Sequence, residues 1–349
     1  MQISKKEVFE QISLFPGTRY MGSKEKLLPA LFETFNELNF TSAIDLMSGT
    51  AVVSYLLKSM GKEVISNDYM HMNHVTAKAL IRNNSSKVTS SQAQSLIEQN
   101  TSSKFVSDTF KGLYFDKENS KMIDSIRNNI NNLSNSTEKN IALAALIRSC
   151  IKKRPRGIFA YTGLRYNDGR KDLKLNINEH FLSNVDMINK AVFSNKKKNK
   201  ALNKDCMLVK ETADLVYIDP PYFSALSDNE YVRRYHFVEG LARNWKNVDW
   251  QPNTKTKKFK SYPSPFTKLE STIEAFDSLI KQHSKSHIVI SYSSNSLPKK
   301  EVILRLLRKY KKNVYMKSVD YRYSFSNQGF AKDKIKNKVS EYIFVGTDK

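Results

Sequence analysis

Cysteine is scarce in this chain, which has only Cys150 and Cys206 in 349 residues. Two cysteines in unrelated contexts supply neither a disulfide framework nor the four ligands of a structural zinc site. We expect both side chains to be buried as small apolar groups.

Long hydrophobic runs are absent as well. No segment approaches the roughly 18 apolar residues of a membrane-spanning helix, and Met1–Val8 lacks the apolar core of a signal peptide. A cytoplasmic protein outside the membrane is therefore expected. The chain also lacks a Gly-x-x-x-x-Gly-Lys-Ser/Thr loop, which argues against a nucleoside triphosphate as ligand.

Acidic residues are the minority among the charged side chains. Lysine and arginine number 57 against 34 aspartates and glutamates, which gives a net charge of +23. This surplus exceeds what solubility requires and favours a polyanionic partner, with nucleic acid as the first candidate. Because 40% of the residues are hydrophobic, the chain can still build a globular core.

The most informative segment is Asp214–Phe223. Leu215–Ile218 is an apolar run typical of a buried parallel strand, so Asp219 is expected at the carboxyl end of that strand, where α/β sheets bind ligands. Pro220 and Pro221 fix φ and leave their carbonyl groups as acceptors. With the ring of Tyr222, these acceptors suit a flat base that carries an exocyclic amine. The alternative is a plain Asp-Pro turn.

A strand, a small-residue loop and a helix are predicted over 43–60. Ser48 and Gly49 lie in this loop, and a second short strand over 61–67 ends at Asp68. This order resembles the β-α-β opening of a nucleotide-binding fold, with close backbone approach at the loop and a carboxylate for ribose hydroxyls. Without a phosphate loop, the pattern favours a nucleoside such as S-adenosylmethionine. Alone, the loop could equally be a tight connection.

The remaining patterns alternate between strands and helices at both ends of the chain. Apolar spacing predicts a helix over 24–38 and strands at Met207–Val209 and His287–Tyr292, with Lys196–Lys200 as a loop. The middle of the chain is polar with scattered helical periodicity. We therefore expect an α/β domain formed by residues 1–71 and 201–349, with a mostly parallel sheet, and a mainly helical insertion over 72–200.

Basic residues are interleaved with aromatic residues after the helix predicted at 141–148, a pattern that fits contact with nucleic acid. The candidates are Lys152, Lys153, Arg154 and Arg156. Lys257 and Lys258 lie in a second basic cluster, for which a solvated face is the alternative.

Several motifs of this chain, and their order along it, resemble those of the adenine-specific DNA methyltransferases of the DNA adenine methylase type. This family includes restriction-modification members. The resemblance covers nearly the whole chain and rests on Thr18–Leu28, Asp45–Val53, Asn67–Asp68, Asp205 and Asp219–Tyr222. It implies a Rossmann-like, S-adenosylmethionine-dependent fold with helices on both faces of the sheet. It also implies that the insertion reads the target sequence and that no metal is required.

The resemblance assigns roles residue by residue. Tyr20, Gly22 and Lys24 would lie over the methionine part of the donor. Asp45, Ser48 and Gly49 would form the donor loop, Asp68 would bind the ribose, and Asp205 would lie near the donor's adenine. Asp219, Pro220, Pro221 and Tyr222 would be catalytic.

The donor loop departs from the family pattern at two positions, where Met47 replaces an aromatic residue and Ala51 replaces a glycine. If position 51 requires a positive φ, alanine would cost about 1 kcal/mol. Donor affinity is the property at stake.

The predicted activity is methylation of the 6-amino group of adenine in a specific double-stranded DNA sequence, beside a cognate restriction endonuclease. The target base would flip out and stack on Tyr222. Alternatives are a cytosine 4-amino methyltransferase, an RNA adenine methyltransferase, and a non-catalytic nucleic-acid-binding module.

Overall fold

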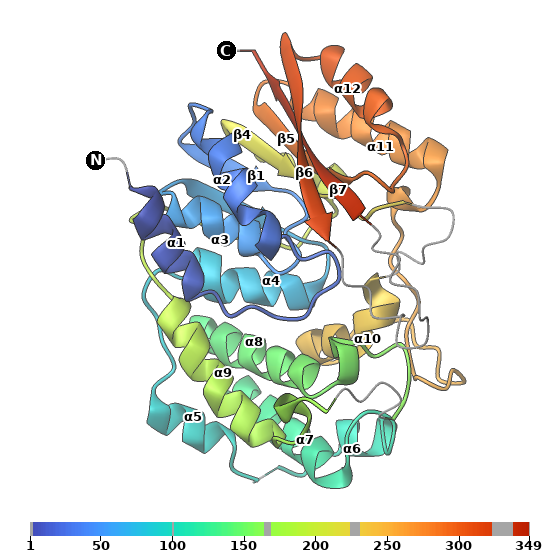
Figure 1. Cartoon of the computed structure of the whole chain (residues 1–349). Coiled ribbons are helices and arrows are strands. Elements are labelled where there is room, and N and C mark those ends of the chain that lie inside the picture. Colours follow the sequence, from blue (N-terminus) through green and yellow to red (C-terminus); the bar gives the residue numbers. More distant parts are fainter. Residues whose placement is uncertain (1–2, 100, 164–168, 224–230, 323–337, 349) are drawn as a thin grey trace. The chain divides into compact units, whose positions relative to one another are not determined.

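The computed structural model describes residues 3–99, 101–163, 169–223, 231–322 and 338–348. The chain, drawn in Figure 1, divides into two compact units. Unit 1 consists of Met1–Glu25, Ser48–Lys204 and Glu230–Tyr262. Unit 2 consists of Lys26–Met47, Asp205–Asn229 and Pro263–Lys349.

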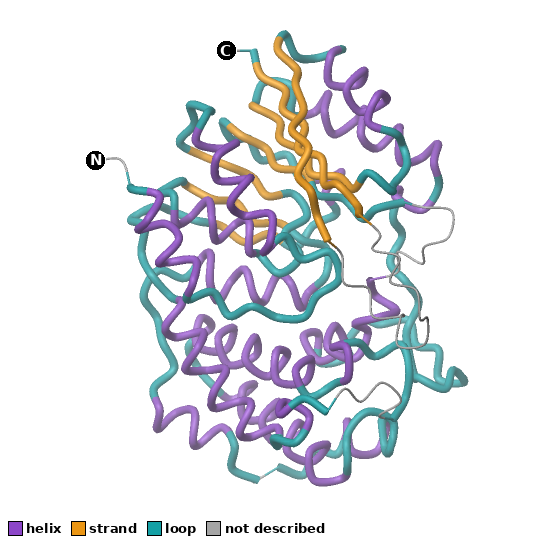
Figure 2. The backbone as a smooth tube through the Cα atoms, viewed as in Figure 1, coloured by secondary structure: helices purple, strands orange, loops and turns teal. Residues whose placement is uncertain are grey.

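Unit 2 is built on a sheet with strand order β1-β4-β5-β7-β6 (Figure 2). Its strands are β1 (Ser42–Asp45), β4 (Leu215–Ile218), β5 (His287–Ser293), β6 (Asn313–Arg322) and β7 (Lys338–Thr347). Strands β1, β4 and β5 run parallel, whereas β7 is antiparallel to both β5 and β6. All residues of β4 are buried, as expected of a parallel strand covered on both faces.

Helices cover both faces of this sheet. They are α2 (Leu28–Asn36), α11 (Leu269–Gln282) and α12 (Lys300–Arg308). Tyr217 of β4 packs edge-on against Phe35 of α2, and Tyr292 of β5 packs edge-on against Phe276 of α11. Because the Tyr217 hydroxyl lies 2.6 Å from Ser291 Oγ, these two side chains share one face, and the next residue, Tyr292, points to the other. The predicted α/β class, mostly parallel with helices on both faces, is confirmed.

Unit 1 is mainly helical. Its strands are β2 (Glu63–Asn67) and β3 (Lys200–Leu202), which pair in parallel. Its α-helices are α1 (Lys5–Ser13), α3 (Val52–Ser59), α4 (His71–Ala77), α5 (Ser90–Leu96), α6 (Phe105–Thr109), α7 (Lys117–Asn132), α8 (Ser136–Lys152), α9 (Ile177–Ala191) and α10 (Tyr231–Arg243). Helices α7, α8 and α9 pack against one another (Figure 1). The buried residues of α8 form a continuous run from Ile141 to Ile151.

Residues 72–200 form most of these helices, in keeping with the helical character expected of them. Their separation from residues 1–71 and 201–349, and their role in reading the target, stay predictions. None of the helices in the described ranges is long and apolar enough to cross a membrane. Both cysteines are buried, as expected.

One local prediction was wrong, and a second needs a small change. Met207–Val209 is not a strand, because the Asp205 carboxylate accepts a hydrogen bond from Met207 N at 3.0 Å and caps a 3-10 turn over Cys206–Leu208. The loop predicted at Lys196–Lys200 is confirmed over residues 196–199, and its last residue begins β3, where Lys200 lies opposite Ile65 of β2. A three-residue strand is too short to give a period-2 signal in the sequence.

The loop before α3 contains a strained alanine. Ala51 lies immediately before the helix with φ +64° and ψ +18°, in the left-handed region that favours glycine. Its N–H donates to Ser48 O at 2.7 Å, which closes the turn. The positive φ that would make alanine unfavourable at this position is therefore present.

We predict that Ala51→Gly is tolerated better than the same substitution in a right-handed helix. Ala145→Gly in α8 is the matched control, because both alanines are fully buried and both variants lose a methyl group. Only Ala51→Gly relieves a left-handed backbone conformation. The free energy of unfolding of Ala51→Gly should therefore exceed that of Ala145→Gly by about 1–2 kcal/mol. Urea denaturation measures this difference, and equal losses would contradict it.

Candidate active site

Asp68 organises the donor loop of unit 1. Its Oδ2 accepts a hydrogen bond from Gly49 N and its Oδ1 accepts one from Met70 N, both at 2.8 Å. Burial raises the pKa of Asp68 to about 6, although the two backbone donors act in the opposite direction. The carboxylate therefore ties the loop after β1 to the end of β2.

Tyr20 is brought against this loop from the N-terminal motif. A Cβ atom on Gly49, where φ is +51°, would lie 3.3 Å from the Tyr20 ring, so the glycine allows a close approach. Asn73 Nδ2 donates to Tyr20 Oη at 3.0 Å, and Asn73 also hydrogen-bonds Asp68. Tyr235 of α10 stacks on Tyr20 with ring centroids 4.8 Å apart. Motifs distant in sequence thus meet in unit 1.

Gly22 and Lys24 shape the turn that follows Tyr20. Gly22 has φ +79°, and a Cβ atom there would lie 2.9 Å from the Tyr231 hydroxyl. Lys24 is buried and its Nζ donates to Gly22 O at 2.9 Å. Both residues of the predicted motif therefore hold the backbone of this turn.

Ser48 offers a polar atom for a ligand. Its backbone N–H donates to Asn67 O at 2.9 Å, whereas its buried Oγ has no hydrogen-bond partner within the described ranges. Buried hydroxyl groups are normally paired, so an orphaned one in this loop is what a polar ligand would satisfy. The residues present fit a nucleoside donor on this ground.

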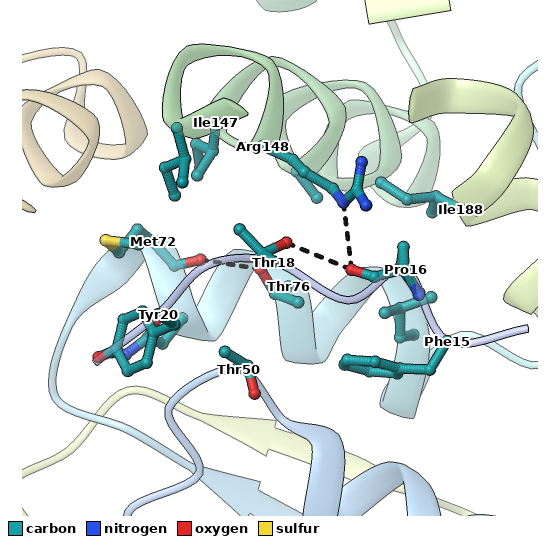
Figure 3. A pocket seen from close by; sticks show the side chains of 14 residues that line it. Phe15, Pro16, Thr18, Tyr20, Thr50, Met72, Thr76, Ile147, Arg148 and Ile188 are labelled. Atoms are coloured by element: carbon teal, nitrogen blue, oxygen red, sulfur yellow. Dashed lines mark hydrogen bonds between the residues drawn. The ribbon is translucent and has the colours of Figure 1, made fainter. Parts of the chain in front are cut away.

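A cavity of about 40 Å³ lies next to Tyr20 and Thr50 (Figure 3). It has room for a few water molecules but not for a nucleoside. On its far side, Arg148 of α8 donates to Pro16 O at 3.1 Å and to Gly17 O at 2.6 Å. Arg148 thereby fixes the segment that leads into Tyr20.

Glu239 also supports this loop. It is fully buried on α10 and accepts hydrogen bonds from His71 N at 3.0 Å and Met72 N at 2.9 Å. Tyr262 Oη donates to it at 2.7 Å. Glu239 therefore caps the N-terminus of α4, the helix that carries Asn73.

In unit 2, Asp45 and Asp219 lie at the carboxyl ends of adjacent parallel strands. Asp45 is the register partner of Tyr217, and Leu46 N donates to Tyr217 O at 3.1 Å. Burial, together with the charges of Asp219, Asp45 and Glu341, raises the pKa of Tyr217 well above its usual range. The expected place of Asp219, after the buried β4, is the one observed.

Two hydrogen bonds hold the Asp-Pro-Pro-Tyr motif to the sheet. Ser291 Oγ of β5 donates to Asp219 Oδ1 at 2.9 Å. Tyr222 Oη donates to Glu341 Oε2 of β7 at 2.9 Å, and lies 3.4 Å from Asp219 Oδ1. Neither Ser291 nor Glu341 was among the predicted site residues.

The two prolines of the motif and the residue after them also lie against the sheet. Pro220 is buried and Pro221 is half-buried, and the motif is followed by Phe223, which forms a β-bridge to Leu297. The N–H of Phe223 also donates to Tyr292 Oη at 3.4 Å. The segment after the motif is thereby held against β5.

Asp205 lies elsewhere in unit 2. Its carboxylate caps the turn over Cys206–Leu208, as described above for the backbone of that segment. Its predicted place near the adenine of the donor stays a prediction.

Arg154 does not take the place expected of it. Its side chain is fully buried, with Nη1 donating to Tyr114 O and Gly163 O and Nη2 donating to Tyr161 O, at 2.9 to 3.2 Å. The guanidinium also lies over the ring of Tyr114 at 5.1 Å. Direct phosphate contact by Arg154 is therefore corrected to a structural role, because the aromatic residues and carbonyl groups around it enclose the charge.

The other basic candidates stay closer to the surface. Lys152, Arg156, Lys257 and Lys258 are half-buried, as is Lys153, whose Nζ donates to Leu173 O at 3.2 Å. The two basic segments converge on Tyr114, whose Oη lies 3.1 Å from Phe159 O and 2.7 Å from Thr256 O. Phosphate contact by these five residues stays a prediction.

Among the residues that the structure describes, no three His, Cys, Asp or Glu side chains gather in a way that could hold a metal ion. The geometry consists instead of backbone turns, aromatic rings and carboxylates in hydrogen bonds. Such groups suit a nucleoside in unit 1 and an amine in unit 2.

Comparison with known families decides between the alternatives. The family model for the D12 class N6 adenine-specific DNA methyltransferases matches residues 20–295. The chain belongs to this family. The match spans the Tyr20–Lys24 motif, the donor loop and Asp219–Tyr222, and it confirms the predicted adenine-specific DNA methyltransferase. The match does not favour the three alternatives, which were a cytosine 4-amino methyltransferase, an RNA adenine methyltransferase and a non-catalytic nucleic-acid-binding module.

Curated relatives support the same assignment. The chain is 26% identical over 347 residues to the type II methyltransferase M2.HphI of Haemophilus parahaemolyticus, covering 95% of this chain and 97% of the relative. It is 28% identical to the modification methylase StsI of Streptococcus sanguinis and 27% identical to the type II methyltransferase M.FokI of Planomicrobium okeanokoites. In both cases 93% of this D12 class chain is covered, but only about half of the relative's length.

The contrast between Arg154 and the lysines can be tested on DNA. Arg154→Met should lower the free energy of unfolding by roughly 3 kcal/mol, because it strands buried carbonyl groups. Lys257→Gln with Lys258→Gln should leave stability nearly unchanged. The double lysine variant should instead show a flatter slope of the logarithm of the DNA association constant against the logarithm of the salt concentration. The slope should change by about 0.9 for each phosphate that the variant no longer neutralises.

Fluorescence anisotropy with a DNA duplex, together with urea denaturation, makes both measurements. A flattened salt slope in Arg154→Met at a temperature where the variant is folded would restore the phosphate role of Arg154. An unchanged slope in the double lysine variant would remove Lys257 and Lys258 from the DNA interface.

Proposed function

We propose that this D12 class enzyme transfers a methyl group from S-adenosylmethionine to the 6-amino group of adenine in a specific double-stranded DNA sequence. The observation that carries the proposal is the Asp219–Tyr222 motif, held at the carboxyl end of a buried parallel strand by Ser291 and Glu341. The family match makes the chemistry adenine-specific.

Unit 1 supplies residues for the methyl donor. Bound S-adenosylmethionine supplies an activated methyl group on a sulfonium centre. The ionised Asp68 carboxylate would accept hydrogen bonds from the ribose hydroxyls, and Ser48 Oγ would gain the partner that it lacks within the described ranges. The glycine at 49 permits close backbone approach, and Tyr20, Gly22 and Lys24 would lie over the methionine portion.

In unit 2 we assign Asp45 to the donor as well, and Asp205 to the region near its adenine. Asp45 is fully buried at the end of β1, the strand that leads into the donor loop. Asp205 fixes the backbone before Cys206 through its own cap. Both assignments rest on the match of these positions to the family motifs.

Asp219 and the Pro220 carbonyl are the proposed acceptors for the target amine. The lone pair of an adenine amine is delocalised into the ring, so hydrogen bonds from its two N–H groups localise the pair and aim it for in-line transfer. Asp219 acts as an acceptor rather than a strong base, and the rate comes from positioning and electrostatics. Tyr222 is the platform on which the flipped base stacks.

The biological setting follows from the curated relatives. Three of them carry the names of type II methyltransferases or modification methylases. We propose that this chain modifies DNA within a restriction-modification system and that a cognate endonuclease reads the same sequence. DNA is its macromolecular partner, which agrees with the net charge of +23.

A direct assay tests the proposal. The protein is incubated with methyl-labelled S-adenosylmethionine and either duplex DNA or RNA, and the products are digested to nucleosides. Label in N6-methyldeoxyadenosine is expected. Label in a cytosine derivative or in RNA would redirect the proposal, and no label in any nucleic acid would sink it.

Asp219→Ala should lower kcat by roughly 100- to 1000-fold or more, because it removes an acceptor aimed at the reacting amine. Its affinity for DNA should stay nearly unchanged. Asp214→Asn is the matched control at the opposite end of β4, where its carboxylate caps Thr41 and Ser42. Wild-type turnover by Asp219→Ala would remove Asp219 from the mechanism.

Donor affinity should depend on the ionisation of Asp68, whose pKa burial raises to about 6. Because the pKa is raised, the charged form is present above pH 6 and is lost as pH falls. The Kd for S-adenosylmethionine should therefore be constant above pH 7 and rise by up to about tenfold per unit below pH 6. Calorimetric titration from pH 5 to 8 measures this, and Asp68→Asn should flatten the profile. A flat wild-type profile would contradict the ribose role.

A further inference from the structure

Glu341 is a buried carboxylate beside the proposed catalytic motif. It lies on β7 opposite Ser293 of β5 and Val319 of β6, and its side chain is fully buried. A carboxylate in such a place costs free energy unless it is hydrogen-bonded. No motif in the sequence marks this position as functional.

The hydroxyl of Tyr222 is directed to this carboxylate. Tyr222 Oη lies 2.9 Å from Glu341 Oε2 and 3.4 Å from Asp219 Oδ1. A phenol has one proton to donate, and the shorter contact is the better hydrogen bond. The Tyr222 hydroxyl therefore donates to Glu341 rather than to Asp219.

The ring of Tyr222 also packs against a second aromatic residue. Tyr292 of β5 meets it edge-on, with centroids 5.1 Å apart and an interplanar angle of 80°. A ring that packs against another ring and is hydrogen-bonded at its hydroxyl has few rotamers left. Such a ring is a preorganised surface for stacking.

We propose that Glu341 is a positioning residue for methyl transfer, which orients the Tyr222 ring so that the flipped adenine stacks in register with Asp219. The inference rests on the proposed function. Glu341 acts through the Tyr222 hydroxyl and touches neither the base nor the donor. Its charge strengthens the hydrogen bond that holds the platform in place.

A double-mutant cycle separates this role from a purely structural one. Tyr222→Phe keeps the ring but removes the hydroxyl, and Glu341→Ala removes the acceptor. If Glu341 acts through Tyr222, each single variant should lower kcat roughly tenfold. The double variant should then be no slower than either one, because both changes delete the same interaction. Glu341→Gln, which keeps an acceptor oxygen, should recover part of the rate.

The experiment uses the full chain, with kcat and KM for DNA measured below the unfolding temperature of every variant. The KM should change less than kcat, because Glu341 orients the Tyr222 ring on which the flipped base stacks. Once the methylated sequence is known, 2-aminopurine at the target position gives a second readout, since its fluorescence reports stacking. Glu37→Gln is the matched control, because Tyr315 donates to Glu37 at an exposed site of the same unit.

The outcomes distinguish the inference from the function on which it rests. If the wild-type protein methylates no DNA, the proposed function fails. If it does, but Glu341→Ala is as fast as wild type or slows Tyr222→Phe by a further tenfold, the inference is overturned. Should Glu341→Ala not fold, the cycle with Glu341→Gln and Tyr222→Phe gives the same test.

Discussion

A buried carboxylate must be hydrogen-bonded, and this constraint organises both units. Asp68 fastens the donor loop by accepting from Gly49 N and Met70 N. Glu341 holds the aromatic ring of the catalytic motif through its hydroxyl. In each case hydrogen-bond donors offset the cost of removing a carboxylate from water, so the groups that stabilise the fold also fix the geometry of the proposed site.

The sequence was a good guide where the physical signal is local. The continuous apolar run Leu215–Ile218 predicted a parallel strand buried on both faces, and the position of Asp219 at its carboxyl end followed directly. The strand, small-residue loop and helix over 43–60, and the place of Asp68 at the end of the next strand, were predicted in the same way. These features depend on neighbours in sequence, so pattern and structure agree.

Other residues depend on partners that the sequence does not place. Arg154 sits in a basic run, and only the rings and carbonyl groups that gather around it reveal a buried side chain. Asp205 turned an apolar stretch into a capped 3-10 turn. Glu341 looks like any acid in a strand until its pairing places it against Tyr222. Spatial neighbours decide all three, and periodicity carries no information about them.

The cap on α4 has a consequence for how the enzyme folds. The residue before the helix, Met70, gives no side-chain cap, and the N-terminal amides bond instead to Glu239, 167 and 168 residues further along. Helix α4 therefore gains its N-terminal cap only when α10 is docked, so the two helices depend on each other although they lie far apart in sequence. Because Asn73 on that helix donates to Tyr20, the cap supplied by α10 also supports the position of the Tyr20 ring.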